Sequence, residues 1–132
     1  MTWIDNADAV IQTWFAGQEF GNALVDIITG EVNPSGRLPT TFPKNIADTP
    51  AYDCYPGKDA QMNYDEKLLV GYRWYDRKAN APLFQFGHGL SYTQFEYSDL
   101  EIKMGNNNEV SCKFFIANIG DFIGEEVAQC YV

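Results

Sequence analysis

The chain has 132 residues, of which 45% are hydrophobic and 15% aromatic, a composition that excludes an intrinsically disordered protein. Its 18 acidic and 9 basic residues give a net charge of −9 at pH 7, which argues against nucleic acid or an anionic membrane as a partner. No apolar run approaches the roughly 18–20 residues of a membrane span, and the N-terminus lacks the basic and apolar regions of a signal peptide.

The first third of the chain has the pattern of a strand, a turn and a helix. Residues Ala7–Phe15 form a short β-branched and aromatic run, which predicts a buried strand. Residues Gln18–Thr29 carry apolar side chains at helical spacing, and Gly30 stands where a helix ends. This order is typical of an α/β layer with a parallel sheet, which needs neighbouring strands, so we expect such strands to precede Met1.

A long irregular segment follows the predicted helix. Asn33–Gly36 is a turn signal, and the prolines Pro39 and Pro43 exclude a central strand or a helix. Residues 44–63 show no clear period, and a loop of this length is usually functional or draped over another surface. The apolar run Tyr64–Tyr75 then resumes the pattern of an ordered element.

The last third of the chain has the pattern of successive β-strands. We expect strands at Tyr97–Lys103, Val110–Ala117 and Glu126–Val132, with a hairpin turn at Gly105–Asn108. Strands at this spacing predict an all-β sandwich, which needs roughly seven strands where only three are present. The sequence therefore predicts a β-sandwich that continues beyond Val132.

A distinctive motif joins the two halves, Phe86–Thr93, in which two glycines flank the single histidine of the chain. Glycine permits positive φ and close approach of backbone, so the motif predicts a specifically shaped turn at a junction between two modules. One histidine cannot build a histidine metal site or a catalytic relay. We therefore expect His88 to hydrogen-bond the backbone of its own turn.

The three cysteines, Cys54, Cys112 and Cys130, have no metal-ligand spacing, and their odd number weakens any disulfide framework. Cys112 and Cys130 fall on inward faces of the predicted strands, so we expect free thiols in the core. No residue cluster in the sequence points to a metal ion or another cofactor.

Several blocks of sequence together resemble the C-terminal part of the family 3 glycoside hydrolases, the β-glucosidase and β-xylosidase group. The blocks occur in the same order as in the family and span almost the whole chain. They are Trp14–Ala23, Asn33–Pro43, Tyr64–Asp76, Phe84–Phe95, Ala117–Asp121 and Gly124–Val132.

The resemblance implies a fold that is α/β first and all-β afterwards. Residues 1–43 would be the end of an α/β sandwich domain, and residues 44–92 a long irregular connector that carries the Tyr64–Asp76 and Phe86–Thr93 motifs. Residues 93–132 would be the first strands of an incomplete fibronectin-III-like β-sandwich. An N-terminal barrel domain would precede them and act as the partner of this chain.

The activity that the resemblance implies is retaining hydrolysis of O-glycosyl bonds at non-reducing sugar ends, with two carboxyl groups about 5–5.5 Å apart. The family's nucleophile is an Asp in a Ser-Asp-Trp motif on the barrel, and its acid/base is commonly a Glu in a Glu-Gly-x-Asp-Arg context. Neither motif is present, since Ser98-Asp99-Leu100 lacks the Trp and Tyr75-Asp76-Arg77 lacks the Glu-Gly. We therefore expect no catalytic residue in this chain, and both carboxylates upstream of it.

Three residues of the Tyr64–Asp76 block are candidates for substrate binding. Glu66 lies among aromatic residues that would raise its pKa, but the favoured interpretation is a Glu that pairs with a basic neighbour such as Arg73 and fixes a strand. Arg73 could hold a carboxylate with two hydrogen bonds, or brace a loop. Trp74 could stack on a pyranose ring, but aromatic residues in an apolar run are more often part of a core.

The favoured hypothesis is a non-catalytic C-terminal portion of a β-glucosidase-like enzyme that acts on a β-linked glucoside or short oligosaccharide. A stand-alone carbohydrate-binding or adaptor module derived from such an enzyme is the alternative, and a truncated product without a stable fold is the third. An uncovered apolar face and sheet edge disfavour an independent module. The compartment stays open, because relatives are mostly secreted or periplasmic and some fungal ones are intracellular.

Overall fold

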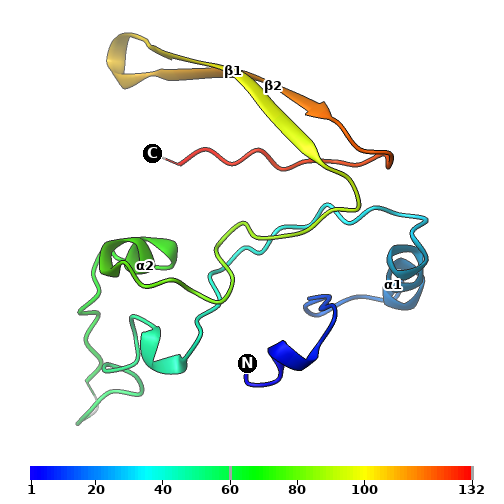
Figure 1. Ribbon diagram of the computed structural model, residues 1–132. Helices are drawn as coiled ribbons and strands as arrows, with labels where there is room; N and C mark the ends of the chain where they lie inside the picture. The colour runs from blue at the N-terminus through cyan, green and yellow to red at the C-terminus, as the bar shows by residue number, and fades with distance from the viewer. Residues whose placement is uncertain (60, 132) are drawn as a thin grey trace. The chain divides into compact units, whose positions relative to one another are not determined.

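The computed structural model describes every residue of the chain except Ala60 and Val132. It contains a small two-stranded antiparallel sheet and several helices (Figure 1). Their order is η1 (Ile4–Asn6), α1 (Phe20–Thr29), η2 (Ile46–Asp48), α2 (Tyr72–Lys78), β1 (Phe95–Met104), η3 (Asn106–Asn108) and β2 (Val110–Asn118).

The chain divides into two compact units. Unit 1 comprises Met1–Ala16 and Arg37–Gly89, and unit 2 comprises Gly17–Gly36 and Leu90–Val132. Each unit therefore joins two stretches that are distant in the sequence, and each depends on the contacts that hold those stretches together.

The helix predicted for Gln18–Thr29 is confirmed as α1. It ends where the sequence indicates, because Gly30 adopts the left-handed conformation with φ 82° and its N–H donates to Ile27 O at 3.1 Å. Leu24 and Ile27 are the half-buried positions of the helix, one turn apart on the same face.

The strand predicted for Ala7–Phe15 is wrong. The segment has no regular secondary structure, and its side chains from Asp8 onward are exposed, with Phe15 fully so. A strand is defined by hydrogen bonds to a neighbouring strand. None of the described residues supplies such a ladder to this segment, so its apolar composition alone does not make a strand.

In unit 1 the proline-containing segment runs antiparallel to the motif segment around His88. The Leu38 N–H donates to His88 O at 2.8 Å, and the Gly87 N–H donates to Leu38 O at 2.7 Å. Four residues further on, the Phe42 N–H donates to Phe84 O at 2.8 Å and these two residues form an isolated β-bridge. The prolines between and beyond these donors prevent a regular strand, as predicted.

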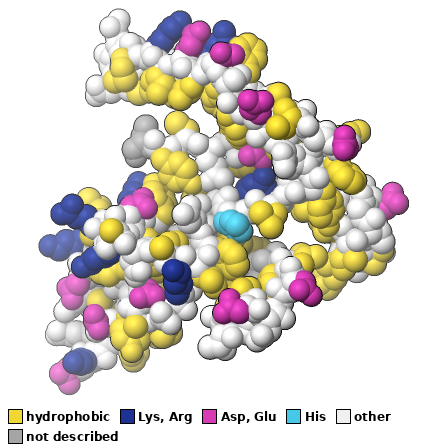
Figure 2. Space-filling view, viewed as in Figure 1, with side chains coloured by type: hydrophobic (Ala, Val, Ile, Leu, Met, Phe, Trp, Pro, Cys, Tyr) yellow, Lys and Arg dark blue, Asp and Glu magenta, His cyan; other side chains and the backbone are white. Residues whose placement is uncertain are grey.

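The predicted shape of the Gly-His-Gly turn is confirmed at Gly87, where φ is 79°. His88 is predicted to hydrogen-bond the backbone of its own turn. Its backbone does so, because the His88 N–H donates to Gln85 O at 3.1 Å. The imidazole ring instead stacks on Phe84, with ring centroids 5.0 Å apart. Figure 2 shows this single histidine at the surface.

The block Tyr64–Tyr75 contains no strand. Residues 65–68 form a turn, and α2 begins at Tyr72 after Gly71, whose φ of 60° suits glycine. Arg77 and Lys78 lie in the last turn of α2, where positive charge is favoured by the helix dipole. The apolar run is thus split between a turn and a short helix because Gly71 interrupts it.

In unit 2 the predicted hairpin is confirmed as β1 and β2, joined through η3. Its register contains a bulge, because Asp99 and Leu100 of β1 together face Phe114 of β2. Asp99 adopts a positive φ of 53° at this point. The extra residue reverses the alternation along β1, so Tyr97 and Ile102 lie on the same face of the hairpin.

The third strand, predicted for Glu126–Val132, is wrong over its described part; Val132 itself lies outside the described residues. Residues 126–131 run along the hairpin without a hydrogen-bond ladder (Figure 1). The prediction of Cys112 and Cys130 as core thiols is wrong as well, because both are exposed. Only Tyr75 and Thr93 are buried among the described residues, so the hairpin has no core of its own.

The two stretches of unit 2 are joined by the side chain of Asn33. Its Oδ1 accepts hydrogen bonds from the Tyr92 N–H at 2.8 Å and the Ser91 hydroxyl at 3.0 Å, and its Nδ2 donates to Ile123 O at 3.1 Å. A Cβ on Gly124 would lie 2.6 Å from this Nδ2, so the chain needs glycine there.

The buried Thr93 continues this network. Its hydroxyl donates to Asn118 Oδ1 at 2.6 Å, and the Asn118 Nδ2 donates to Phe122 O at 2.7 Å. These bonds fix the turn after β2 against the start of β1.

Two glycines, Gly21 inside α1 and Gly30 directly after it, give a matched test of the helix. Gly21 lies inside the helix with open space around its Cβ position, so Gly21→Ala should stabilise α1 by about 1 kcal/mol. Gly30→Ala places a side chain at positive φ and should destabilise it by about 1 kcal/mol. Amide exchange within α1 measures both changes, and shifts in the same direction would contradict this account of the helix.

Candidate functional site

The candidate residues of the sequence lie in unit 1, where the loop after Pro43 meets α2. This loop carries η2, which begins with a capping box. The Asn45 N–H donates to Asp48 Oδ2 at 3.0 Å, and the Asn45 side chain accepts from the Asp48 backbone in return. The first turn of the loop is therefore ordered by its own residues.

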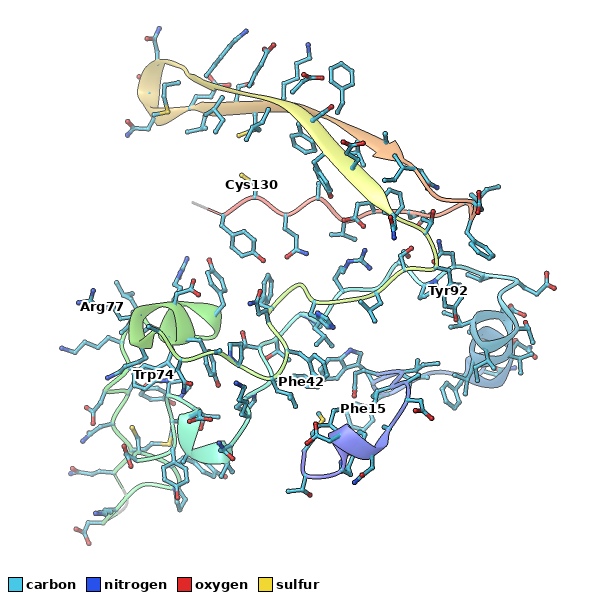
Figure 3. The ribbon with its side chains drawn as sticks, in the orientation of Figure 1. Phe15, Phe42, Trp74, Arg77, Tyr92 and Cys130 are labelled. Carbon is cyan, nitrogen blue, oxygen red and sulfur yellow. The ribbon has the colours of Figure 1, made fainter. Side chains whose placement is uncertain are left out.

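Trp74 connects α2 to this loop. Its Nε1–H donates to Asp48 O at 3.0 Å, and Figure 3 shows the indole on the side of α2 that faces η2. The Lys78 Nζ lies 4.9 Å from the centroid of the Trp74 ring, a cation–π contact within the helix. The half-buried Trp74 thus holds the loop, and its ring is already engaged by a cation.

Tyr75, the next residue of α2, is the buried apolar centre of this region. It is 5% exposed. Burial raises the pKa of its hydroxyl, and the negative charge of Asp48 raises it further. Asp48 is therefore close to two aromatic residues of the helix, through its backbone to Trp74 and through its charge to Tyr75.

The pKa of Asp48 is lowered, first by the hydrogen bond from the Asn45 backbone and then by a hydrogen bond from the Asn80 side chain. The nearby Lys44 lowers it further, and desolvation opposes these effects in part. Hydrogen bonds to an ionised carboxylate favour the charged form. Asp48 is thus an ionised structural group that joins the loop to the end of α2.

The structure separates the other two candidates. Glu66 is half-buried in the turn 65–68, where its carbonyl accepts from the Leu69 N–H at 2.9 Å. Arg73 is exposed, and its guanidinium lies 5.8 Å from the centroid of the Tyr72 ring. No ion pair joins Glu66 to Arg73 among the described residues, so the predicted pairing between them is not formed.

A second cluster of rings lies in unit 1, along the paired segments Leu38–Phe42 and Leu83–His88. Trp14 meets Phe42 edge-on at 6.1 Å, and Phe42 meets Phe84 edge-on at 6.2 Å between ring centroids. His88 stacks on Phe84 at the end of this row. Such contacts stabilise the pairing of the two segments beyond their backbone hydrogen bonds.

Within the described part of the chain, no group of three or more metal-binding side chains comes together. The same residues include no helix long and apolar enough to cross a bilayer. The site therefore consists of a loop ordered by Asp48 and Trp74, with Glu66 and Arg73 near it in the sequence.

The sequence of this region matches a known protein family. Residues 1–92 match the glycosyl hydrolase family 3 C-terminal domain. The chain belongs to this family. The matched residues include the loop, α2 and both paired segments of unit 1.

Similar proteins are β-glucosidases of bacteria and fungi. The chain is 45% identical to thermostable beta-glucosidase B of Acetivibrio thermocellus and 42% identical to probable beta-glucosidase K of Emericella nidulans, with all of the chain aligned in both. It covers 18% and 15% of these relatives, so it corresponds to a small portion of a longer enzyme.

Solved structures give the same result. Beta-glucosidase 3B from Thermotoga neapolitana in complex with alpha-D-glucose matches 90% of this chain with a TM-score of 0.84 and 41% identity. The family 3 beta-glucosidase of Bifidobacterium adolescentis matches 91% with a TM-score of 0.87 and 37% identity. The chain covers 17% and 18% of these two structures.

Asp48 is the residue that the sequence analysis missed. Its signal was present as Asn45-Ile46-Ala47-Asp48, in which a capping residue is followed by an acidic residue three positions later. No apolar period accompanies these residues, so periodicity alone predicts only a loop there. In this family 3 domain, Asp48 and Trp74 give that segment its order.

The lowered pKa of Asp48 predicts the direction of a pH effect. Because its folded-state pKa lies below the ordinary value of 3.8, the ionised carboxylate contributes its full stabilisation above that value. The contribution is lost as pH falls through the lower folded-state pKa. An NMR titration of the Asp48 carboxyl should therefore have its midpoint below 3.8.

Replacement of the amide partner tests the cause of this shift. Asn80→Ala should raise the Asp48 midpoint towards its ordinary value, whereas Asn22→Ala, in unit 2, should leave it unchanged. A midpoint at or above 3.8 in the unmodified chain would contradict the capping role of Asp48.

Proposed function

We propose that this chain is the non-catalytic C-terminal portion of a retaining β-glucosidase that hydrolyses a β-linked glucoside or short oligosaccharide at its non-reducing end. It would comprise the end of an α/β sandwich domain (residues 1–43), a connector (44–92) and the first strands of a fibronectin-III-like module (93–132). Its role would be to hold the enzyme's catalytic barrel and α/β domain in place around the sugar.

The observation that carries this proposal is the family match together with the small share of each relative that the chain covers. The relatives and structural neighbours named above are all β-glucosidases. The chain contains neither a Ser-Asp-Trp nor a Glu-Gly-x-Asp-Arg motif, so the two carboxyl groups of retaining hydrolysis would come from other parts of the enzyme.

The exposed surface supports a role within a larger protein. A folded monomer of 14.9 kDa exposes about 7,000 Å², and two separate domains of half that mass about 8,500 Å². This chain exposes 11014 Å². The excess includes large apolar side chains such as Phe15, Leu68 and Ile123, and it is comparable in size to permanent subunit interfaces.

The loop held by Trp74 would be the part of this chain nearest to the chemistry. Of the candidates, Trp74 would act as a positioning residue, because its indole N–H is used by Asp48 O and its ring by Lys78. Arg73 and Glu66 would be the groups free to approach the sugar or a neighbouring domain. No cofactor takes part in this proposal.

A chimera tests the proposed function. Thermostable beta-glucosidase B of Acetivibrio thermocellus would have its matching segment, 135 aligned residues, replaced by this chain. We expect the chimera to hydrolyse an aryl β-glucoside, and the isolated 132-residue chain to show no turnover.

The matched variants separate positioning from direct contact. In the chimera, Trp74→Phe keeps the ring but removes the donor to Asp48 O, and we expect kcat/KM to fall by about 10-fold, a loss of about 1.4 kcal/mol typical of one hydrogen bond. Trp3→Phe, at an exposed tryptophan that precedes η1, is the control and should not change kcat/KM.

Turnover by the isolated chain would overturn the assignment as non-catalytic. A soluble, folded chimera that lacks activity would contradict the proposed structural role. An unchanged kcat/KM in Trp74→Phe would remove the positioning role while leaving the assignment to the enzyme intact.

A further inference from the structure

Unit 2 contains a groove between the hairpin and the segment that follows it. One wall is formed by β1 and β2, the other by residues 126–131, and the enclosed volume is about 670 Å³. The two walls are joined by the Tyr97 hydroxyl, which donates to Glu126 Oε1 at 2.9 Å. No hydrogen-bond ladder holds the segment to the hairpin, so these side chains determine how closely it lies.

Two of the three cysteines line this groove, one on each wall. Cys112 lies on β2 directly opposite Ile102. Because of the bulge in β1, Tyr97 lies on this same face of the hairpin. Cys130 lies on the other wall, and Figure 3 shows its side chain pointing from the segment towards the hairpin. Both are free thiols and both are exposed to solvent.

The two thiols are close enough to affect each other. Partial desolvation raises the pKa of Cys112, and the charge of Cys130 and a hydrogen bond that the neutral Cys112 thiol donates to the Cys130 sulfur raise it further. A hydrogen bond between thiols requires their side chains to meet in the groove. Cys54 lies in unit 1 and has no such neighbour in this groove.

We propose that Cys112 and Cys130 are a redox-active pair that forms a disulfide by exchange with a small-molecule disulfide such as oxidised glutathione. One thiolate attacks the glutathione disulfide, which forms a mixed disulfide and releases one glutathione thiolate. The second cysteine thiolate then displaces the other glutathione. One S–S bond is formed and one broken, the two cysteines are oxidised, and two reduced glutathione molecules are released.

The disulfide would join β2 to the segment at residues 126–131 and close a loop of 19 residues, counted from Cys112 to Cys130. It would supply a covalent link where backbone pairing is absent, and so keep the groove narrow. Reduction would leave the segment held by non-covalent contacts such as the hydrogen bond from Tyr97 to Glu126. This inference does not depend on the proposed enzymatic function.

The test is to incubate the full 132-residue chain in buffers with varied ratios of reduced to oxidised glutathione, and to map disulfides by mass spectrometry without reduction. We expect a Cys112–Cys130 peptide pair, loss of two hydrogens from the intact mass, and Cys54 still open to alkylation. The ratio of the Cys112–Cys130 disulfide to the Cys54–Cys112 disulfide should be at least 10-fold higher in the folded chain than in the denatured chain.

The same chain in concentrated urea is the reference. There, loop closure alone favours Cys112–Cys130 over the longer Cys54–Cys112 loop by about six-fold. Cys112→Ser should leave Cys130 as a mixed disulfide with glutathione, whereas Cys54→Ser should not change the pairing. Equal selectivity with and without urea would overturn the proposal. Separate glutathione adducts on Cys112 and Cys130 in the native buffer would overturn it as well.

Discussion

The structure depends on the antiparallel pairing of two segments that lie about fifty residues apart, 33–42 and 83–92. In unit 1 the pairing consists of backbone hydrogen bonds at Leu38 and Phe42. In unit 2 the contact is made by the side chain of Asn33, which binds the backbone of Tyr92 and of Ile123. In unit 2 the Asn33 contacts join the two stretches, together with the Tyr92 hydroxyl, which donates to Ile27 O at 2.7 Å. In unit 1 the bonds at Leu38 and Phe42 order the longer stretch, and the Trp14–Phe42 ring contact joins the shorter stretch to it.

This pairing explains why the family motifs have their particular residues. The turn at Gly87 brings the Gly87 N–H and the His88 carbonyl into position to bond Leu38, so the shape of the motif suits this backbone pairing. Gly124 leaves room for the amide of Asn33. Gly87, His88 and Gly124 are therefore residues of backbone pairing and close approach.

The same constraint limits what the chain contributes to function. The paired segments bring the loop at η2 and the helix α2 into one unit, where Trp74 and Asp48 fix them to each other. These are positioning contacts. The two groups in this region whose pKa values are shifted, Asp48 and Tyr75, order the loop and pack in the buried centre of unit 1. This agrees with the membership of the chain in a C-terminal domain of family 3.

Local signals in the sequence predicted the elements that depend on local contacts. Gly30 ended α1 as expected, and the hairpin formed where alternation and the turn at Gly105 indicated. The failures are elements whose hydrogen bonds must come from elsewhere: Ala7–Phe15 and Glu126–Val132 have strand-like composition, but no described segment offers them a ladder.

The site was predicted less well than the fold. Trp74 was named, but its role in holding Asp48 depends on a contact between residues 26 positions apart, which no local pattern contains. The bulge at Asp99 was equally invisible, since one extra residue in β1 changes which side chains share a face without changing composition. Long-range geometry, and not residue type, decided both.

Hydrogen exchange at the Tyr92 amide tests the central pairing most directly. This N–H donates to Asn33 Oδ1, so Asn33→Ala should speed its exchange about 10-fold, a loss of about 1.4 kcal/mol. Asn33→Asp keeps the acceptor but loses the donor to Ile123 O, so it should leave Tyr92 protected. Equal exchange at Tyr92 in the unmodified chain and in Asn33→Ala would contradict the pairing as the constraint on which unit 2 depends.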